Sequence, residues 1–77
     1  MPSHKLTDNQ RKQLAELDSI YAAKGAELEL SFKDQIATTE AAGDWEKAEK
    51  FRQQWSKERQ RLATELEAKK DQIRQAV

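Results

Sequence analysis

The sequence has no cysteine, one histidine, one proline and two glycines among its 77 residues. Without cysteine the chain forms no disulfide and offers no thiolate ligand to a metal ion. A cysteine-free chain fits a reducing compartment, and we expect a cytoplasmic protein. The longest apolar run, Ile20–Ala23, is far shorter than the roughly 20 residues that span a bilayer. We therefore expect no membrane span, and the N-terminus lacks the apolar stretch of a secretory signal.

Residues that commonly carry catalysis or bind metals are also scarce. The one histidine, His4, lies close to the N-terminus, so no serine has a plausible base and no Glu-x-x-His metal motif occurs. The two glycines, Gly25 and Gly43, lie too far apart to form a phosphate-binding loop. We predict that the protein is not an enzyme and has no cofactor, metal site or small-molecule substrate.

Charge of one sign is not in excess, because 14 basic residues balance 14 acidic residues. A nucleic-acid-binding protein usually carries a basic surplus, so this balance disfavours that class. One alternative remains, because a basic line on one side of the second half of the chain could follow a phosphate backbone. The basic line consists of Lys47, Lys50, Lys57 and Arg61.

The residues that are present favour helix, and local signals mark where helices begin and end. Thr7 followed by Gln10 is typical of an N-cap with a capping box. Gly43 suits the left-handed residue that ends a helix, and Asp44 suits the N-cap of the next helix. We predict a flexible lead at residues 1–7 and a single domain at residues 8–77.

Within that domain the signals predict helices at 8–42 and 45–75 joined by a turn at 43–44. Apolar residues recur at intervals of eleven, which corresponds to about 3.67 residues per turn and nearly straight helices. Antiparallel helices folded at one turn pair residues whose numbers add to a constant. Ile36 with Phe51 adds to 87, and the midpoint of that sum falls between residues 43 and 44.

This agreement predicts an all-α fold, an antiparallel helical hairpin that resembles a coiled coil with an eleven-residue repeat. The same register predicts which side chains meet between the two helices, a row that we call the seam. The seam residues are Leu14, Tyr21, Gly25, Leu28, Phe32, Ile36, Phe51, Trp55, Leu62, Leu66 and Ile73. Gly25 leaves two alternatives open, because the first helix either continues through this residue or breaks there.

Charged residues flank the predicted seam. An acidic row of Glu16, Glu27 and Asp34 lines one side of the first helix, and the basic line occupies the matching side of the second. On the other flank Asp18 is expected to face Lys70. Residues 1–42 carry a net charge of −2 and residues 43–77 a net charge of +2. We expect these charges to select antiparallel pairing and to neutralise the basic line.

Two helices present only one face each to one another, which is too little burial to offset the entropy lost on ordering this chain. We therefore predict self-association, with a dimer favoured, in which two hairpins form a four-helix bundle. Leu30 points away from the predicted seam, and Ile20 and Trp45 lie at its edges. These three residues are our candidate intermolecular contacts.

Residues 36–60 resemble the UVR motif, a helical hairpin of bacterial nucleotide-excision repair subunits and Clp-associated regulatory proteins. In that motif the second helix opens with an aromatic residue, a glutamate, alanines, an apolar residue and an arginine. The matching residues are Trp45, Glu46, Ala48, Phe51 and Arg52, with Ile36 as the facing apolar residue. The sequence departs from the motif at Trp45, where phenylalanine is usual, and at Glu49, where a second alanine is usual. The resemblance implies docking to a protein and no catalysis.

Taken together, these patterns predict a non-catalytic protein–protein interaction or oligomerisation module, either a small helical adaptor or a structural protein. The expected partner is a second copy of the chain, another protein, or both. The alternative is an accessory nucleic-acid-binding protein that uses the basic line. The two differ in salt dependence, because phosphate binding weakens steeply with added salt and apolar docking much less.

Overall fold

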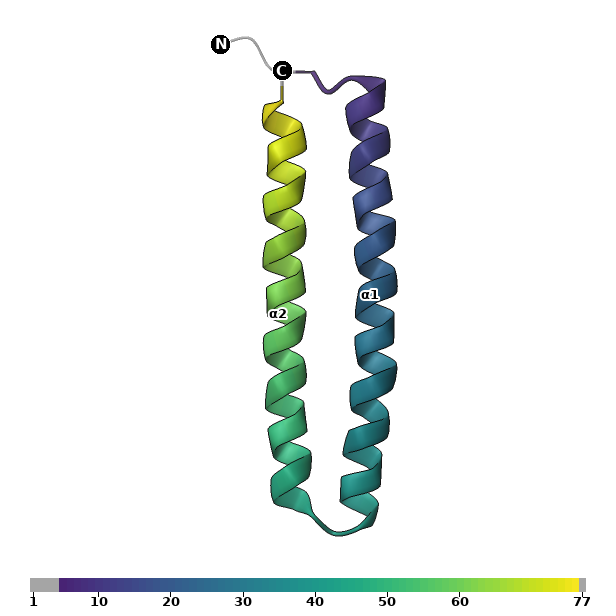
Figure 1. The fold of residues 1–77 in the computed structure, drawn as a ribbon, viewed down its shortest axis with the longest axis vertical. Coiled ribbons are helices and arrows are strands. Elements are labelled where there is room, and N and C mark those ends of the chain that lie inside the picture. The colour runs from purple at the N-terminus through teal and green to yellow at the C-terminus, as the bar shows by residue number, and fades with distance from the viewer. Residues whose placement is uncertain (1–4, 77) are drawn as a thin grey trace.

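Two long antiparallel helices account for nearly all of residues 5–76, the part of the chain that the computed structural model describes (Figure 1). Helix α1 spans Asp8–Ala41, helix α2 spans Trp45–Gln75, and no strand occurs in the described range. This confirms the predicted all-α hairpin. Predictions about residues 1–4, including His4, lie outside the described residues, as does Val77.

The start of α1 has the predicted capping box. The Thr7 hydroxyl accepts a hydrogen bond from the Gln10 backbone N–H at 3.0 Å, and the Gln10 side-chain oxygen accepts one from the Thr7 N–H at 2.8 Å. Each bond satisfies a backbone donor that the first turn of a helix leaves without a partner. The last residues of the predicted lead are thus attached to the helix, and the Leu6 carbonyl also accepts a bond from Arg11.

The turn between the helices is held by backbone hydrogen bonds. Helix α1 ends one residue earlier than predicted, because Ala42 is its C-cap. Gly43 has a φ of +77°, a left-handed conformation that favours glycine. Its N–H bonds to the Glu40 carbonyl and the Asp44 N–H to the Thr39 carbonyl, which together form a Schellman motif. The Asp44 carboxylate then caps α2 by accepting from the Lys47 N–H at 3.1 Å.

Helix α1 continues through Gly25 without a break, which settles the alternative left open by the sequence. A Cβ atom placed at Gly25 would meet no atom within 4 Å, so the glycine is not needed for close approach of the helices. This differs from Gly43, where the positive φ requires the absence of a side chain.

The helices pack along a seam in the register expected from the sequence, with the rings of Phe32 and Trp55 stacked 6.4 Å apart. Tyr21 and Ile36 are buried there, together with Ala48. No large side chain in the described range is fully buried. The remaining predicted seam residues are half-buried, namely Leu14, Gly25, Leu28, Phe32, Phe51, Trp55, Leu62, Leu66 and Ile73.

The shape of the hairpin explains why most seam side chains are only partly buried. The Cα trace measures 59 × 20 × 13 Å, which is a slab one helix thick. A helix with its side chains is about 10–12 Å across, so every seam residue lies within one side-chain length of both broad faces. The hairpin therefore has an apolar seam and no enclosed core.

Gln10 fastens the end of the hairpin opposite the turn. Its side-chain nitrogen donates to the carbonyls of Ile73 and Ala76, at 2.9 and 2.8 Å, while its oxygen takes part in the capping box. The side chain is 8% exposed. One amide thus satisfies the start of α1 and two of the orphan carbonyls at the end of α2.

Substituting the two glycines by alanine is expected to shift stability in opposite directions. Gly25→Ala should raise the free energy of unfolding by about 1 kcal/mol, because it removes a flexible residue from a helix interior that has room for a methyl group. Gly43→Ala should lower it by about 1–2 kcal/mol, because an L-residue is strained at positive φ. Urea unfolding at one fixed protein concentration measures both, and shifts of the same sign would contradict this account.

Gln10→Ala should destabilise the hairpin by about 1–2 kcal/mol, because it removes half of the capping box and both bonds to α2. Gln13→Ala, an exposed position one turn further along α1, is the matched control and should change stability by less than about 0.5 kcal/mol. Thermal unfolding followed by circular dichroism distinguishes them. Equal effects would show that the Gln10 bonds contribute nothing.

Candidate interaction surface

The slab has two broad faces, and charged contacts cover one of them, which we call the bridged face. Asp18, Glu29 and Glu40 recur every eleven residues along α1 and therefore lie in one row on this face. Lys70 lies 2.8 Å from Asp18, and Arg52 forms an ion pair with Glu40. Both pairs join α1 to α2. The Asp18 pair matches the sequence prediction, whereas the Glu40 pair was missed although the eleven-residue interval leads to it.

Between these two ion pairs, Arg59 covers the seam. Its guanidinium carbon lies 4.6 Å from the centre of the Trp55 ring, a cation–π contact. The pKa of Glu29 is lowered, mainly by the hydrogen bond and positive charge of Lys33, which lies 2.6 Å away, and also by the charge of Arg59. Charged groups thus lie along the bridged face, and between Asp18 and Arg59 a groove lined mainly by apolar residues remains open.

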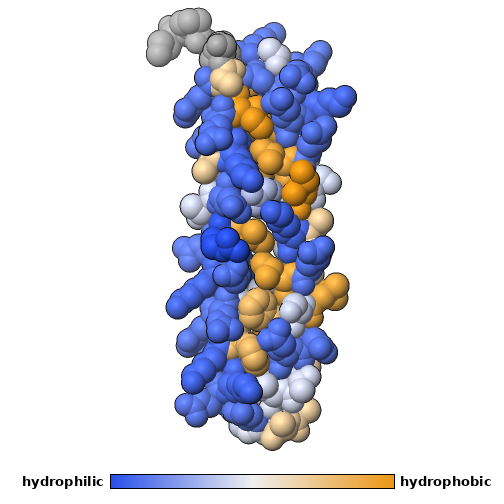
Figure 2. Space-filling view, in the orientation of Figure 1, coloured by the Kyte–Doolittle hydropathy of each residue, from blue (hydrophilic) through white to orange (hydrophobic). Residues whose placement is uncertain are grey.

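The opposite face, which we call the open face, has no ion pair between the helices among the described residues. Two grooves follow one another along this face. The α1 residues that line them are one, three or four positions apart in the sequence and so lie on one side of the helix, which makes the two grooves one continuous strip. The apolar residues that line the strip are Leu17, Ile20, Leu28, Leu62 and Ile73. Figure 2 shows apolar side chains reaching the surface along the seam, with hydrophilic side chains on both flanks.

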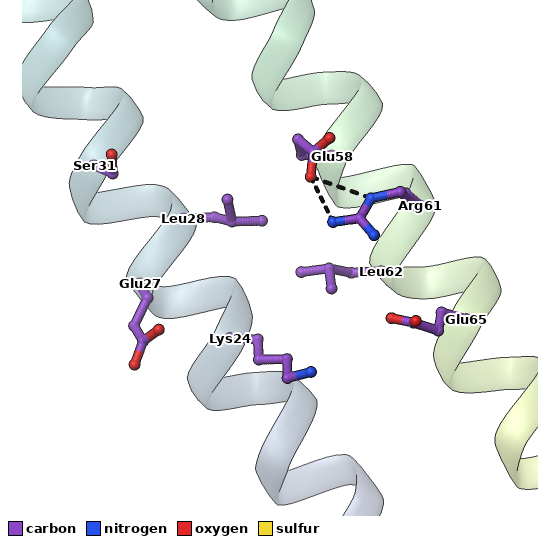
Figure 3. Close-up of a pocket in the computed structure, with 8 residues that line it drawn as sticks. All are labelled: Lys24, Glu27, Leu28, Ser31, Glu58, Arg61, Leu62 and Glu65. Atoms are coloured by element: carbon purple, nitrogen blue, oxygen red, sulfur yellow. Dashed lines mark hydrogen bonds and ion pairs between the residues drawn. The ribbon is translucent and has the colours of Figure 1, made fainter.

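A close-up of the groove between residues 24–31 of α1 and residues 58–65 of α2 shows the side chains that line it (Figure 3). Leu28 and Leu62 point toward each other across the gap between the helices, and Lys24 also extends into it. Arg61 turns to Glu58 on its own helix, with hydrogen bonds of 2.8 and 3.2 Å. The groove is shallow, and three carboxylates and two cations surround its apolar floor.

The expected pairing of the acidic row with the basic line across the seam is wrong. In residues 5–76 no ion pair joins them, and Arg61 uses Glu58 instead. The reason is geometric. Glu27 and Arg61 each directly precede a seam leucine, and one residue is a rotation of about 100°, so both side chains point out of the open face rather than at each other. The basic line is therefore exposed, although Glu58 and Glu65 lie beside it.

The three candidate contacts are exposed but do not form one patch. Their exposed fractions are 51% for Ile20, 73% for Leu30 and 64% for Trp45. Ile20 lines the open face. Leu30 follows the seam residue Leu28 by two positions, a rotation of about 200°, and so lies on the outer edge of α1. Trp45 is the first residue of α2, beside the turn.

Within residues 5–76 no group of three His, Cys, Asp or Glu residues could hold a metal ion. The Tyr21 hydroxyl and the Trp55 ring nitrogen are buried without a hydrogen-bond partner, and the ammonium groups of Lys24 and Lys69 lie 4.9 and 5.4 Å from the Tyr21 ring centre. In the described range, neither helix is apolar enough over sufficient length to span a membrane.

Comparison of the chain with protein-family models, curated proteins and solved structures finds no match. The surface itself is therefore the basis for a functional proposal. Its distinctive property is the contrast between a face on which ion pairs join the two helices and a face on which no described residues form such a pair.

Proposed function

We propose that this protein is a non-catalytic interaction module that self-associates through its helical hairpin, most simply as a dimer that forms a four-helix bundle. The proposal rests on the solvent-accessible surface area of the chain. The chain exposes 6,011 Å², whereas a compact monomer of this length exposes about 4,800 Å². The excess is the surface of a slab that lacks a second layer.

A second hairpin would supply that layer. Helical bundles bury their apolar positions by packing two pairs of helices face to face at 8–10 Å. The half-buried leucine, isoleucine and aromatic side chains of the seam would then form the middle of a bundle rather than the floor of a surface groove. This would give the chain the enclosed core that a single hairpin lacks.

The same surface would also accept a helical segment of another protein, so an adaptor role belongs to the same proposal. The resemblance of residues 36–60 to the UVR motif supports a docking role. A cytoplasmic location, inferred from the cysteine-free sequence, completes the proposal and is testable by cell fractionation.

Light scattering on the purified chain tests self-association. We expect a mass of two chains, falling toward one chain on dilution, and a melting temperature that rises with protein concentration because folding and association are coupled. A monomer mass at every concentration, together with a cooperative and concentration-independent melting temperature, would refute the proposal.

The exposed basic line supports a second candidate, an accessory nucleic-acid-binding function. Lys47, Lys50 and Lys57 make no ion pair with a described residue. If all four cations of the basic line, including Arg61, bound phosphates, log K against log salt on duplex DNA would have a slope of roughly −3.6. Because Glu58 and Glu65 lie beside the line, we favour the interaction module.

A gel-retardation experiment with duplex DNA and with RNA at low salt separates the two candidates. We expect no retarded complex. A complex whose affinity falls with that slope, and that is lost in Lys50→Glu but kept in the control Lys12→Glu, would establish the second candidate instead.

A further inference from the structure

We propose that the open face is the dimer interface and that two copies pack there with their turns at the same end, each α1 lying on the partner's α2. This inference rests on the proposed self-association and adds the face, the orientation and the residues that meet. It identifies the occupant of the uncovered strip as a second copy of this chain.

The choice of face follows from what already covers each side. On the bridged face the Asp18–Lys70 and Glu40–Arg52 pairs and the Arg59 guanidinium lie above the seam, with one open groove between Asp18 and Arg59. Packing another hairpin there would require these charged groups to move or lose water, which is costly. On the open face the ammonium groups of Lys24 and Lys69 lie over the Tyr21 ring, but among the described residues no ion pair there joins the two helices, so apolar burial breaks no ion pair between them.

The choice of a second copy follows from charge. On the open face the acidic row of Glu16, Glu27 and Asp34 belongs to α1, and the basic line belongs to α2. Each row is exposed and unpaired across the hairpin. A two-fold axis parallel to the helices places α1 of one copy over α2 of the other, and symmetry repeats every contact twice. The acidic row and the basic line are therefore complementary in this arrangement, and the open face also carries Glu58 and Glu65 on α2 and Lys24 on α1.

The levels of the charges along the helices agree with this symmetry. Residues whose numbers add to about 87 lie at the same height along the hairpin, a height that we call their level. A two-fold axis parallel to the helices keeps each residue at the same level in both copies. Glu27 then lies beside Arg61 of the other copy, and Asp34 lies between the levels of Lys50 and Lys57. Contacts that do not form within one hairpin thus become available between two.

The opposite orientation, with the turns at opposite ends, brings like charges together. It places α1 on α1, and because α1 is centred between residues 24 and 25, residues adding to about 49 share a level. Asp34 would then meet Glu16 of the other copy. This contact is repulsive, so the acidic row favours the orientation with the turns together.

Ile20 and the exposed area support the same arrangement. Ile20 would lie at the level of residue 67 on the other copy, within one turn of Thr64 and Ala68, which line a shallow groove on α2. If each chain buried its excess of about 1,200 Å², the interface would total about 2,400 Å², in the range of obligate dimers.

Charge reversal on the open face tests the contact between Glu27 and Arg61. Glu27→Arg and Arg61→Glu each place like charges opposite one another twice, and each should raise the dimer dissociation constant roughly three- to tenfold at low salt. An equimolar mixture of the two variants should form a heterodimer of wild-type affinity, because both contacts regain opposite charges. Lys12→Glu, on the outer edge of α1, is the matched control and should leave dimerisation unchanged.

These outcomes separate the two proposals. If the wild-type chain is monomeric, self-association itself is wrong. If the wild type dimerises but the reversals have no effect, or the mixture associates no more tightly than either variant, only the assignment of the open face is overturned. Far-UV circular dichroism checks that each variant keeps its helix content. Ile20→Glu and Leu30→Glu form a matched apolar pair, and only the first should weaken the dimer.

Orientation is measured independently with a spin label. Because the chain has no cysteine, Ala42→Cys places one label beside the turn of each copy. With the turns together the two labels should lie within about 30 Å, given helix separations of 8–10 Å. With the turns at opposite ends they would lie roughly 50 Å apart, close to the length of two 31-residue helices side by side. The longer distance would overturn the proposed orientation.

Discussion

The thickness of the hairpin is the constraint on which the rest of the structure depends. A slab one helix thick has no position that is far from water, so even well-placed apolar side chains are covered on one side only. Tyr21, with the ammonium groups of Lys24 and Lys69 over its ring, and Ile36 are buried, whereas most of the seam remains half-buried. The apolar seam is therefore at once the basis of the fold and the feature that makes a second layer favourable.

Charged residues are arranged differently on the two broad faces of the hairpin. On the bridged face, ion pairs such as Asp18–Lys70 join the helices and specify their register, although exposed pairs of this kind each add little free energy. On the open face, the acidic row of α1 and the basic line of α2 form no ion pair with each other among the described residues. A molecule with no net charge thus keeps an acidic flank and a basic flank, a distribution that composition alone does not reveal.

Much of the fold could be predicted from the sequence, because its signals are local or periodic. The capping box at Thr7, the left-handed Gly43 and the eleven-residue repeat each determine backbone geometry over a few residues. The partners of charged side chains were less predictable. Glu27 and Arg61 lie on matching flanks, but whether they meet depends on the width of the slab, which no sequence interval contains. Gln10 was recognised as a cap, and its bonds to α2 were not, because they join residues 63 and 66 positions away.

The position of Gln10 also determines how the hairpin would respond to force. Helix α1 begins and helix α2 ends at the end of the molecule where the Gln10 side chain joins them, and the turn lies at the opposite end (Figure 1). A force that pulls those two ends apart acts on one level of contacts at a time. The Gln10 hydrogen bonds would break first, and the seam contacts would then break one after another toward the turn. A load applied along the helices would instead shear all levels together. The same fold is therefore mechanically weak in one direction and strong in the other.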